Sequence, residues 1–235
     1  MSTPGPADIA ADVAGVRDAH AALVSSLVGL DDATARAPSR LAGWSVGHVL
    51  THLARNAESF VRVLSDAAGG RVGVQYPGGQ ASRDADIEAG STRSASELLD
   101  DLSATDADLE AALDGTSEEI WATGRARRGE LETPVAFLPL RRLQEVEIHR
   151  VDLGLGYEPE DWPDRFVARE TALVLGGLAH RLPPGVAVEL VVDAGPPALY
   201  GDGSETVRVA RPAREVLEWL VGRSSDPALP VLGPW

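Results

Sequence analysis

Glu145 and His149 stand four residues apart in the stretch PLRRLQEVEIHRVDLG, which covers residues 139–154. On an α-helix this spacing places both side chains on one face, one turn apart. His52 lies on a second predicted helix, in the earlier stretch GWSVGHVLTHLARNAESF at residues 43–60. Two histidines and one carboxylate from two facing helices are the ligand set of an open zinc site, whose fourth position is left for water or substrate. We therefore interpret these three residues as a candidate catalytic metal site.

His48 offers an alternative ligand, because it is also four residues from His52 and the two could form a metal pair on one helix. Ser45, however, is a good N-cap residue, which places His48 at the third position of the first helical turn. We predict that His48 belongs to the capping turn and that His52 is the ligand. Asn56, one turn beyond His52, is either a partner that orients this ligand or an exposed helical residue.

The elements that must position these residues are four helices, predicted at residues 8–30, 46–67, 94–113 and 133–153. Each has apolar residues every three or four positions, and the last opens with Thr133 as cap and Pro134 at the first helical position. His20 falls on the apolar stripe of the first helix, where a buried structural role is the expectation. Four helices in about 155 residues predict a bundle, a fold that often holds metals between inward Glu and His side chains.

Three polar segments separate these helices, and we interpret them as connections: residues 31–40, 68–90 and 117–131. The long middle segment resembles a functional lid or a disordered loop, and Arg83 is its candidate functional residue. The third segment carries a short basic cluster, Arg125, Arg127 and Arg128, which either attracts an anionic ligand or forms a solvated face.

The C-terminal part has a different pattern. A linker is predicted at residues 157–164, a helix at 166–182, strands at 186–192, 198–200 and 206–210, and a last helix at 212–221. This indicates a small α/β unit with a mainly antiparallel sheet. The predicted fold class is therefore α+β, with a metal-binding four-helix bundle at residues 1–156 and the small domain at residues 157–235.

Composition excludes several function classes. The 235 residues include no cysteine, which excludes disulfides, iron–sulfur clusters, thiolate zinc sites and a cysteine nucleophile. No lysine is present either, so Schiff-base catalysis and Walker-type phosphate binding lose their lysine. The formal net charge of −15 disfavours nucleic acid and anionic membrane surfaces as partners. Neither a signal peptide nor a long apolar run is recognisable, so a cytoplasmic protein is expected.

Four stretches carry a family resemblance: LAGWSVGHVLTHLARNAESF at residues 41–60, YPGGQASRDADIEAGST at 76–92, EVEIHRVDLG at 145–154 and VGRSSD at 221–226. In this order and spacing, they resemble the mycothiol-dependent maleylpyruvate isomerases of the DinB-like superfamily of metal-binding helical bundles. The resemblance implies a zinc ion held by His52, Glu145 and His149, and a substrate-binding arginine at Arg223. It also implies that a small sterol-carrier-like α/β domain follows the bundle, with the active site between the two.

The reaction that this resemblance implies is the cis–trans isomerisation of maleylpyruvate to fumarylpyruvate, a step of gentisate-type aromatic degradation. A thiolate adds to the activated double bond, the resulting single bond rotates, and expulsion of the thiolate leaves the trans isomer. Since the chain has no cysteine, a small thiol must supply the sulfur, with mycothiol as the first expectation and ergothioneine as the alternative. Zinc, or another divalent metal, would bind and deprotonate this thiol. Arg223 and Arg83 would hold the substrate carboxylates.

Within this resemblance Glu147 is a rival of Glu145, but it lies only two residues from His149 and so points to another face of the helix. Asp152, three residues after His149, either orients this ligand or neutralises Arg150.

Other readings of the same features stay open. The scaffold also fits an S-transferase that adds mycothiol or a similar thiol to another electrophile, and bacillithiol is a further candidate thiol. A third reading is a zinc-stabilised binding module without catalytic activity. The expected partners are an anionic small-molecule substrate and a small thiol, with no nucleic acid and no membrane, and the expected assembly is a monomer or a weak dimer.

Overall fold

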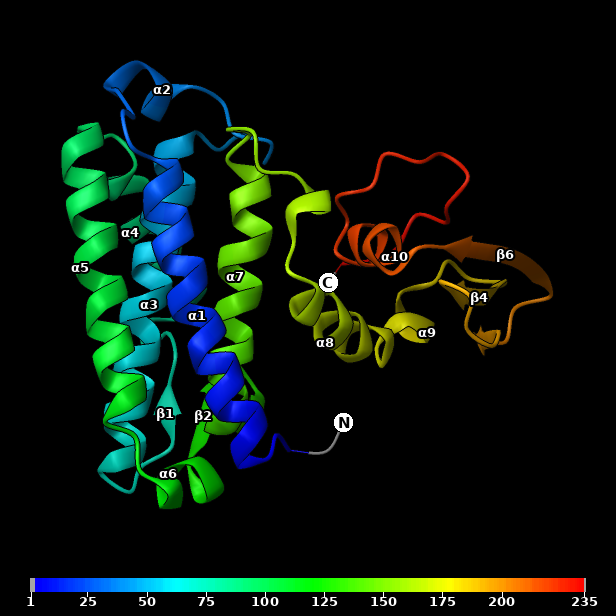
Figure 1. Ribbon diagram of the computed structural model, residues 1–235, viewed down its shortest axis with the longest axis horizontal. Helices are drawn as coiled ribbons and strands as arrows, with labels where there is room; N and C mark the ends of the chain where they lie inside the picture. The colour runs from blue at the N-terminus through cyan, green and yellow to red at the C-terminus, as the bar shows by residue number, and fades with distance from the viewer. Residues whose placement is uncertain (1–2, 235) are drawn as a thin grey trace. The chain divides into compact units, whose positions relative to one another are not determined.

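The computed structural model describes residues 3–234, and four long helices dominate its N-terminal part (Figure 1). They are α1 (Pro6–Ser26), α3 (Val46–Ala68), α5 (Ala95–Asp114) and α7 (Leu138–Asp152). Helix α3 packs against α5 and α7, and α1 packs against the same two helices, so each helix has two neighbours. The predicted four-helix bundle is therefore present.

Local sequence signals explain where two of these helices begin. The Ser45 hydroxyl accepts a hydrogen bond from the His48 backbone N–H, and His48 Nδ1 accepts one from the Ser45 backbone N–H. Ser94 and Glu97 form the same reciprocal capping box at the start of α5. Such boxes satisfy two backbone donors that a helix start would otherwise leave unpaired. His48 thus occupies the capping turn, as predicted.

The segments predicted as connections contain short elements that the sequence pattern did not reveal. Residues 31–40 include α2 (Asp32–Arg36), and residues 68–90 include β1 (Gly73–Val74) and α4 (Gly79–Gly90). Helix α6 (Glu118–Thr123) falls in residues 117–131. The prediction of a long loop at residues 68–90 is therefore wrong. Helix α4 escaped detection because it buries only Ile87 and so has no apolar stripe to give it a periodic signal.

The predicted start of the fourth helix is also wrong. Thr133 and Pro134 belong to β3 (Leu131–Pro134), which pairs with β2 (Arg125–Arg128) in antiparallel fashion, and β1 joins the other side of β2. A short 3₁₀ turn η1 (Val135–Phe137) follows, and α7 then begins at Leu138. The edge position of β3 tolerates the proline, because an edge strand does not need every N–H for its ladder. Pro139 occupies the first turn of α7 that the prediction assigned to Pro134.

A second unit follows, with η2 (Pro159–Asp161), α8 (Asp164–Leu175), α9 (Leu178–Arg181), β4 (Val186–Val192), β5 (Ala198–Tyr200), β6 (Glu205–Arg211) and α10 (Ala213–Leu220). The helix predicted at residues 166–182 is interrupted at Gly176 and Gly177. The sheet order is β5-β4-β6, with three antiparallel pairs between β4 and β5 and seven parallel pairs between β4 and β6. The mainly antiparallel prediction is wrong, because β6 joins the far edge of β4 instead of pairing with β5.

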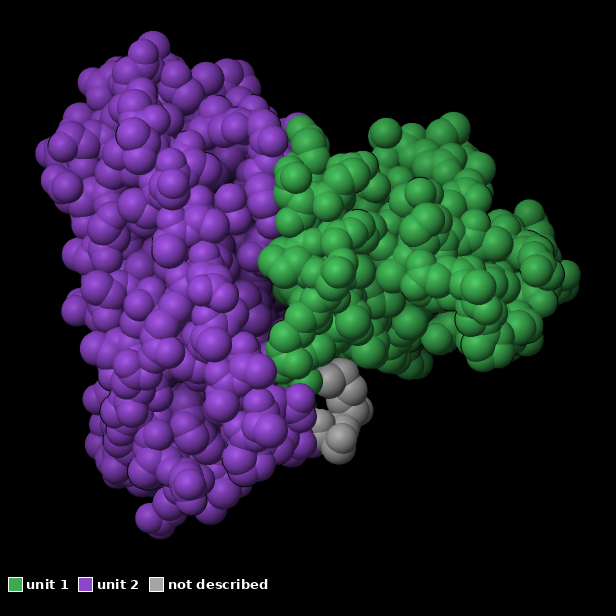
Figure 2. Space-filling model, in the orientation of Figure 1, with its two compact units in different colours: residues 1, 158–235 green, residues 2–157 purple. Residues whose placement is uncertain are grey.

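Two compact units result, divided between Tyr157 and Glu158, and Figure 2 colours them separately. Each has its own core: Leu50, Leu53 and Leu140 are fully buried in the first, and Val188 and Leu217 are fully buried in the second. The predicted α+β class, with a helical bundle followed by a small α/β part, is confirmed. Among the helices of residues 3–234, none is long and apolar enough to cross a membrane.

Candidate metal centre

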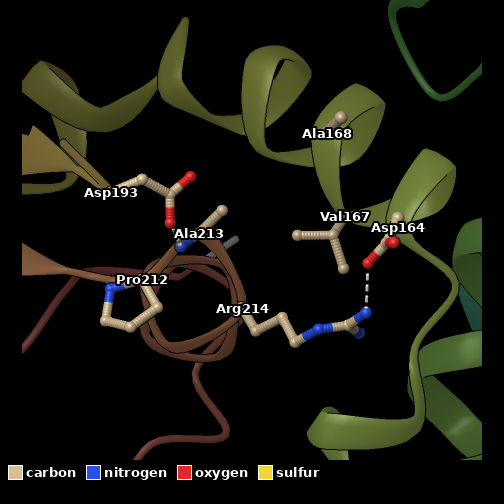
Figure 3. Close-up of a pocket in the computed structure, with 7 residues that line it drawn as sticks. All are labelled: Asp164, Val167, Ala168, Asp193, Pro212, Ala213 and Arg214. Atoms are coloured by element: carbon tan, nitrogen blue, oxygen red, sulfur yellow. Dashed lines mark hydrogen bonds and ion pairs between the residues drawn. The ribbon is translucent and has the colours of Figure 1, made fainter. Parts of the chain in front are cut away.

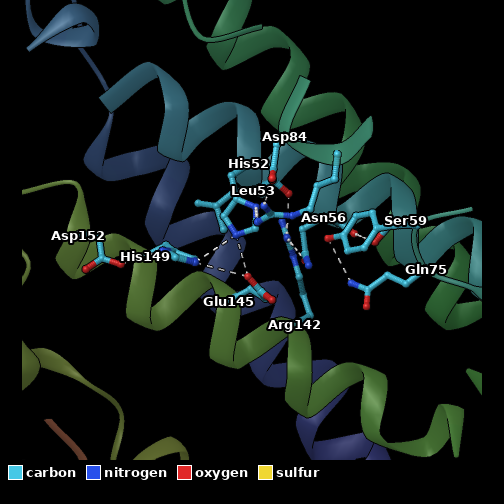
Figure 4. Close-up of polar contacts among 12 residues, drawn as sticks. His52, Leu53, Asn56, Ser59, Gln75, Asp84, Arg142, Glu145, His149 and Asp152 are labelled. Atoms are coloured by element: carbon cyan, nitrogen blue, oxygen red, sulfur yellow. Dashed lines mark hydrogen bonds and ion pairs between the residues drawn. The ribbon is translucent and has the colours of Figure 1, made fainter. Parts of the chain in front are cut away.

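The three predicted ligands lie together between α3 and α7 (Figure 4). His52 Nε2 is 2.9 Å from Glu145 Oε2 and 3.1 Å from His149 Nε2. The remaining side of this triangle, from His149 Nε2 to Glu145 Oε2, measures 3.5 Å. One ligand atom from each residue therefore faces a common point, and we call this group the triad.

The burial pattern of α7 explains why its two ligands face this point. The helix is buried on most sides, but Arg141, Glu145 and His149 form a partly exposed stripe with a spacing of four residues. This spacing keeps the three side chains on one face of the helix. His52 projects from α3 and is only 3% exposed. The triad thus consists of one buried candidate ligand and two that solvent reaches in part.

Arg142 fastens α7 to the other three long helices just beside the triad. Its side chain is fully buried, and its Nη1 donates to the Leu53 carbonyl on α3 at 2.9 Å and to Asn56 Oδ1 at 2.8 Å. Nη2 donates to Asp106 Oδ1 on α5, and Nε donates to His20 Nε2 on α1 at 2.9 Å. Leu53 and Asn56 lie directly after His52 and one turn beyond it, so these bonds fix the register between the helices that carry the ligands.

The contacts of Arg142 with His20 and Asn56 test the predictions made for these two residues. His20 has the buried structural role expected of it. Both expectations for Asn56 are wrong, because the residue is fully buried and accepts a hydrogen bond from Arg142 rather than from His52. Arg142 itself carried no sequence signal, since an arginine in a helix is usually exposed.

A second layer of contacts surrounds the two histidines. His149 Nδ1 is 2.8 Å from Asp152 Oδ2, so an Nδ1–H donates to this carboxylate, and in the neutral ring Nε2 then has the lone pair that a metal needs. Asp152 therefore contacts His149, the first of the two roles predicted for it. His52 Nδ1 faces Arg83 Nη2 instead, at 3.0 Å. The His52 ring also packs against the Trp44 ring in an edge-type arrangement, with 5.7 Å between ring centroids.

The electrostatics favour neutral His52 and ionised Glu145. Burial lowers the pKa of His52 to about 4, although the neighbouring Glu145 carboxylate opposes this effect. Burial would raise the pKa of Glu145, but hydrogen bonds from His149 and His52 outweigh it and hold that pKa well below its usual range. For His149, burial is outweighed by the bonds to Asp152 and Glu145, which raise its pKa. A metal needs its histidines neutral and its carboxylate ionised, and two of the three groups meet this condition over a wide pH range.

The donor set and its spacing fit a zinc ion. Metal–nitrogen and metal–oxygen distances near 2.0–2.1 Å place tetrahedral ligand atoms about 3.3 Å apart. The three distances in the triad, 2.9, 3.1 and 3.5 Å, bracket this value. Two imidazoles, one carboxylate and a fixed Nδ1–H on His149 are the features of an open catalytic site rather than of a closed structural one.

Glu147, the rival carboxylate, lies on another face of α7. Its side chain accepts a hydrogen bond from the Tyr157 hydroxyl, and burial raises its pKa. The structure therefore brings Glu145, and not Glu147, to the two histidines.

Arg83 extends the polar cluster away from His52. Its guanidinium lies 5.7 Å from the centroid of the Tyr76 ring, and the Arg128 guanidinium lies 6.0 Å from the same centroid. Tyr76 also accepts a hydrogen bond from Gln75 Nε2 at 3.3 Å. The sequence pattern gave no signal for Tyr76, because α4 and β2, which bring the two arginines to it, were predicted as loops.

Arg223 belongs to the second unit, directly after Gly222, which ends α10 with a positive φ of 71°. Its Nη1 donates to the Val221 carbonyl at 2.7 Å. The predicted substrate-binding role of Arg223 stays a prediction.

A pocket in the second unit contains none of the predicted site residues. It is lined by Asp164, Val167, Ala168, Asp193, Pro212, Ala213 and Arg214 (Figure 3). Its charged groups already have partners: Arg214 bonds Asp164, and Asp193 accepts from the Ala213 backbone N–H at 3.0 Å. The pocket therefore adds no chemistry to the triad.

Comparisons with known proteins identify the fold and the family of the chain. Residues 16–154 match the family model described as the mycothiol maleylpyruvate isomerase N-terminal domain. A crystal structure of the mycothiol-dependent maleylpyruvate isomerase is similar with a TM-score of 0.83 and 24% identity, covering 96% of this chain and 94% of that one. A crystal structure of a histidine-to-alanine mutant of that isomerase gives a TM-score of 0.82, 23% identity and the same coverage.

No curated protein sequence matches the chain significantly. The two structural likenesses show a shared fold over nearly the whole length, and the family model spans more than half of the chain. The chain therefore belongs to the mycothiol maleylpyruvate isomerase family of enzymes.

Proposed function

We propose that this protein is a thiol-dependent cis–trans isomerase that converts maleylpyruvate to fumarylpyruvate, with mycothiol as the thiol. The observation that carries the proposal is the triad, an open three-ligand site in a chain of this family. The absence of cysteine supports it as well, because the sulfur nucleophile must then come from a bound small molecule. The solved isomerase with the same fold is described as mycothiol-dependent.

The proposed metal is zinc, held by His52, Glu145 and His149. When bound there, zinc supplies a Lewis acid that favours the thiolate over the thiol. Asp152 keeps the His149 proton on Nδ1, which leaves Nε2 available as a ligand. The Arg142 bonds hold α3 and α7 at a fixed spacing, so the ligand geometry exists before the metal arrives.

Arginines are the proposed partners of the substrate, which carries two carboxylates. Arg83 contacts His52 directly, so a carboxylate that it pairs would lie beside the triad. Arg223 is proposed to bind the other carboxylate, as its place after Gly222 in the VGRSSD stretch suggests. Both would orient the substrate double bond and stabilise the negative charge that develops on the carbonyl oxygen during isomerisation.

The test is the ultraviolet absorbance of maleylpyruvate incubated with purified, zinc-loaded protein and mycothiol, ergothioneine or no thiol. We expect turnover with mycothiol, without consumption of the thiol.

Variants of the site residues test the assignment of their roles. His52→Ala, Glu145→Ala and His149→Ala should each lose zinc and turnover, whereas Glu147→Ala should keep the metal. Arg223→Ala should keep zinc and lose turnover. Consumption of the thiol in step with product would contradict an isomerase and indicate an S-transferase, and turnover with ergothioneine alone would overturn the choice of thiol.

A further inference from the structure

His52 and His149 differ in the hydrogen-bond partner that faces their Nδ1 atoms. A neutral histidine that binds a metal through Nε2 carries its proton on Nδ1, and this N–H needs an acceptor. His149 has one, the Asp152 carboxylate at 2.8 Å. His52 does not, because its Nδ1 faces Arg83 Nη2 at 3.0 Å, and a guanidinium can only donate. With a metal on the triad, two donors therefore face each other.

Arg83 has a further donor without a partner. Its Nε is buried and finds no hydrogen-bond acceptor within residues 3–234, while its Nη1 donates to Asp84 Oδ1 at 2.8 Å. Nε and Nη2 form one edge of the guanidinium, the edge that carboxylates bind in a bidentate manner. The metal-loaded site thus has three N–H groups close together, two on Arg83 and one on His52, that lack an acceptor.

We propose that one carboxylate of the substrate inserts between Arg83 and His52 and accepts hydrogen bonds from the guanidinium edge and from His52 Nδ1–H. The inserted carboxylate replaces the donor–donor contact with charge-assisted hydrogen bonds, and it gives His52 the acceptor that Asp152 gives His149. This inference rests on the proposed function, since it assigns the substrate group that the site next to the triad binds.

The element that carries Arg83 is suited to such an insertion. Helix α4 buries only Ile87, and most of its other side chains are exposed, so few buried apolar contacts hold the helix. Elements with few buried apolar contacts open at low cost in free energy. A small outward movement of α4 would open the contact between Arg83 and His52 without disturbing the bundle.

The proposal predicts a thermodynamic coupling. A metal on Nε2 forces the proton onto His52 Nδ1 and so creates the donor for the carboxylate. In return, a bound carboxylate favours the form of His52 that binds the metal. By linkage, the metal must tighten carboxylate binding by the same factor as the carboxylate tightens metal binding.

The experiment measures cobalt(II) binding to the metal-free, full-length protein, with and without saturating maleate as a dicarboxylate probe. Cobalt absorbance reports the metal site directly, so the readout does not depend on turnover. We expect maleate to lower the cobalt dissociation constant roughly ten-fold, within the usual range of coupling between sites. Arg83→Gln should bind cobalt normally and lose this effect. Asp84→Asn should bind maleate more tightly, because it releases Arg83 from a competing carboxylate.

Arg71→Gln is the matched control, since it removes the same charge from an exposed arginine that pairs with Asp66, and it should leave the coupling intact. Full coupling in Arg83→Gln would overturn the inference, because maleate would then act by binding the metal. Normal cobalt binding without any coupling in the wild-type protein would overturn only this inference and leave the isomerase proposal standing. A wild-type protein that binds no cobalt would overturn both.

Discussion

His20 is an uncharged residue in a charged surrounding. Arg142 Nε donates to its Nε2 at 2.9 Å, so the ring proton must lie on Nδ1, which donates to Glu110 Oε1 at 2.8 Å. The Asp106 carboxylate is also close, 3.3 Å from His20 Nε2. Burial, and then the Arg142 charge, lower the pKa of His20 to about 2. The hydrogen bond from Arg142 therefore exists only while His20 is neutral.

This gives His20 a defined effect on stability. Between pH 6.5 and about 2, the unfolded chain binds a proton at His20 and the folded protein does not. The free energy of unfolding must then fall as the pH is lowered, by about 1.4 kcal/mol per pH unit from this residue. His20→Gln keeps an acceptor for Arg142 but removes the titration, so its stability should fall less steeply between pH 6 and 4. Urea denaturation at several pH values measures the slope.

Comparison with the wild-type protein isolates His20 from the other groups in the cluster. Burial raises the pKa of Asp106 and Glu110, which acts in the opposite direction at acidic pH and is present in both proteins. His180→Gln, an exposed histidine of α9, is the control and should leave the slope unchanged. Equal slopes for His20→Gln and wild type would show that His20 is protonated in the folded state.

At the scale of elements, the Arg142 contacts join all four long helices. We expect Arg142→Met to destabilise the protein by about 3–5 kcal/mol, because Asp106 would be left buried without its counter-charge. We also expect weaker metal binding, by roughly ten-fold, since the bonds to Leu53 and Asn56 no longer fix α3 against α7. Cobalt titration of the folded protein measures the change in metal affinity separately from the loss of stability.

Leu109→Ala is the control for this experiment. Leu109 is fully buried on α5, and its truncation should cost about 2–5 kcal/mol through the cavity alone. It leaves the Arg142 bonds in place, so metal affinity should stay close to that of the wild-type protein. Asn56→Ala removes one of the two acceptors of Arg142 on α3. It tests the positioning role of Arg142 in a protein that we expect to be more stable than Arg142→Met. Equal cobalt affinity in all these variants would refute the positioning role of Arg142.

The same elements show what the sequence could predict. The triad was predictable because its ligands lie on long helices with strong periodicity and a readable cap at Ser45. Helix α4 could not be predicted from the sequence, because a helix with one buried residue has no periodic pattern of apolar residues. The strand at Thr133 and Pro134 pairs with β2 in a local hairpin, with only residues 129 and 130 between the two strands. It was missed because these strands bury only Ala126 and have no apolar alternation, whereas Thr133 and Pro134 resemble a helix start. Arg142 was missed because its four acceptors lie 36 to 122 residues away in the chain.

For the whole molecule, charge distribution matters as much as fold. The chain has a net charge of −15 and would repel the proposed dianionic substrate at long range. Arg83 and Arg128 both lie over Tyr76, so positive charge gathers near the triad within an acidic protein. A cation cluster in such a setting acts mainly at short range, where screening by salt is weak. The substrate is therefore expected to be selected by direct carboxylate contacts rather than by long-range attraction.

The division into two units predicts how a metal stabilises the molecule. All three candidate ligands lie in the unit that ends at Tyr157, so we propose that metal binding stabilises this unit and leaves the other unchanged. Metal at about 100 times its dissociation constant adds about 2.7 kcal/mol to the unit that binds it. Hydrogen exchange of the full chain, followed by peptide mass spectrometry, should then show slower exchange of the most protected amides of α3 and α7. The amides of β4 and β6 should not change, and His149→Ala should abolish the difference. Equal slowing in β4 and β6 would mean that the two units unfold as one, because stability is shared only between parts that open together.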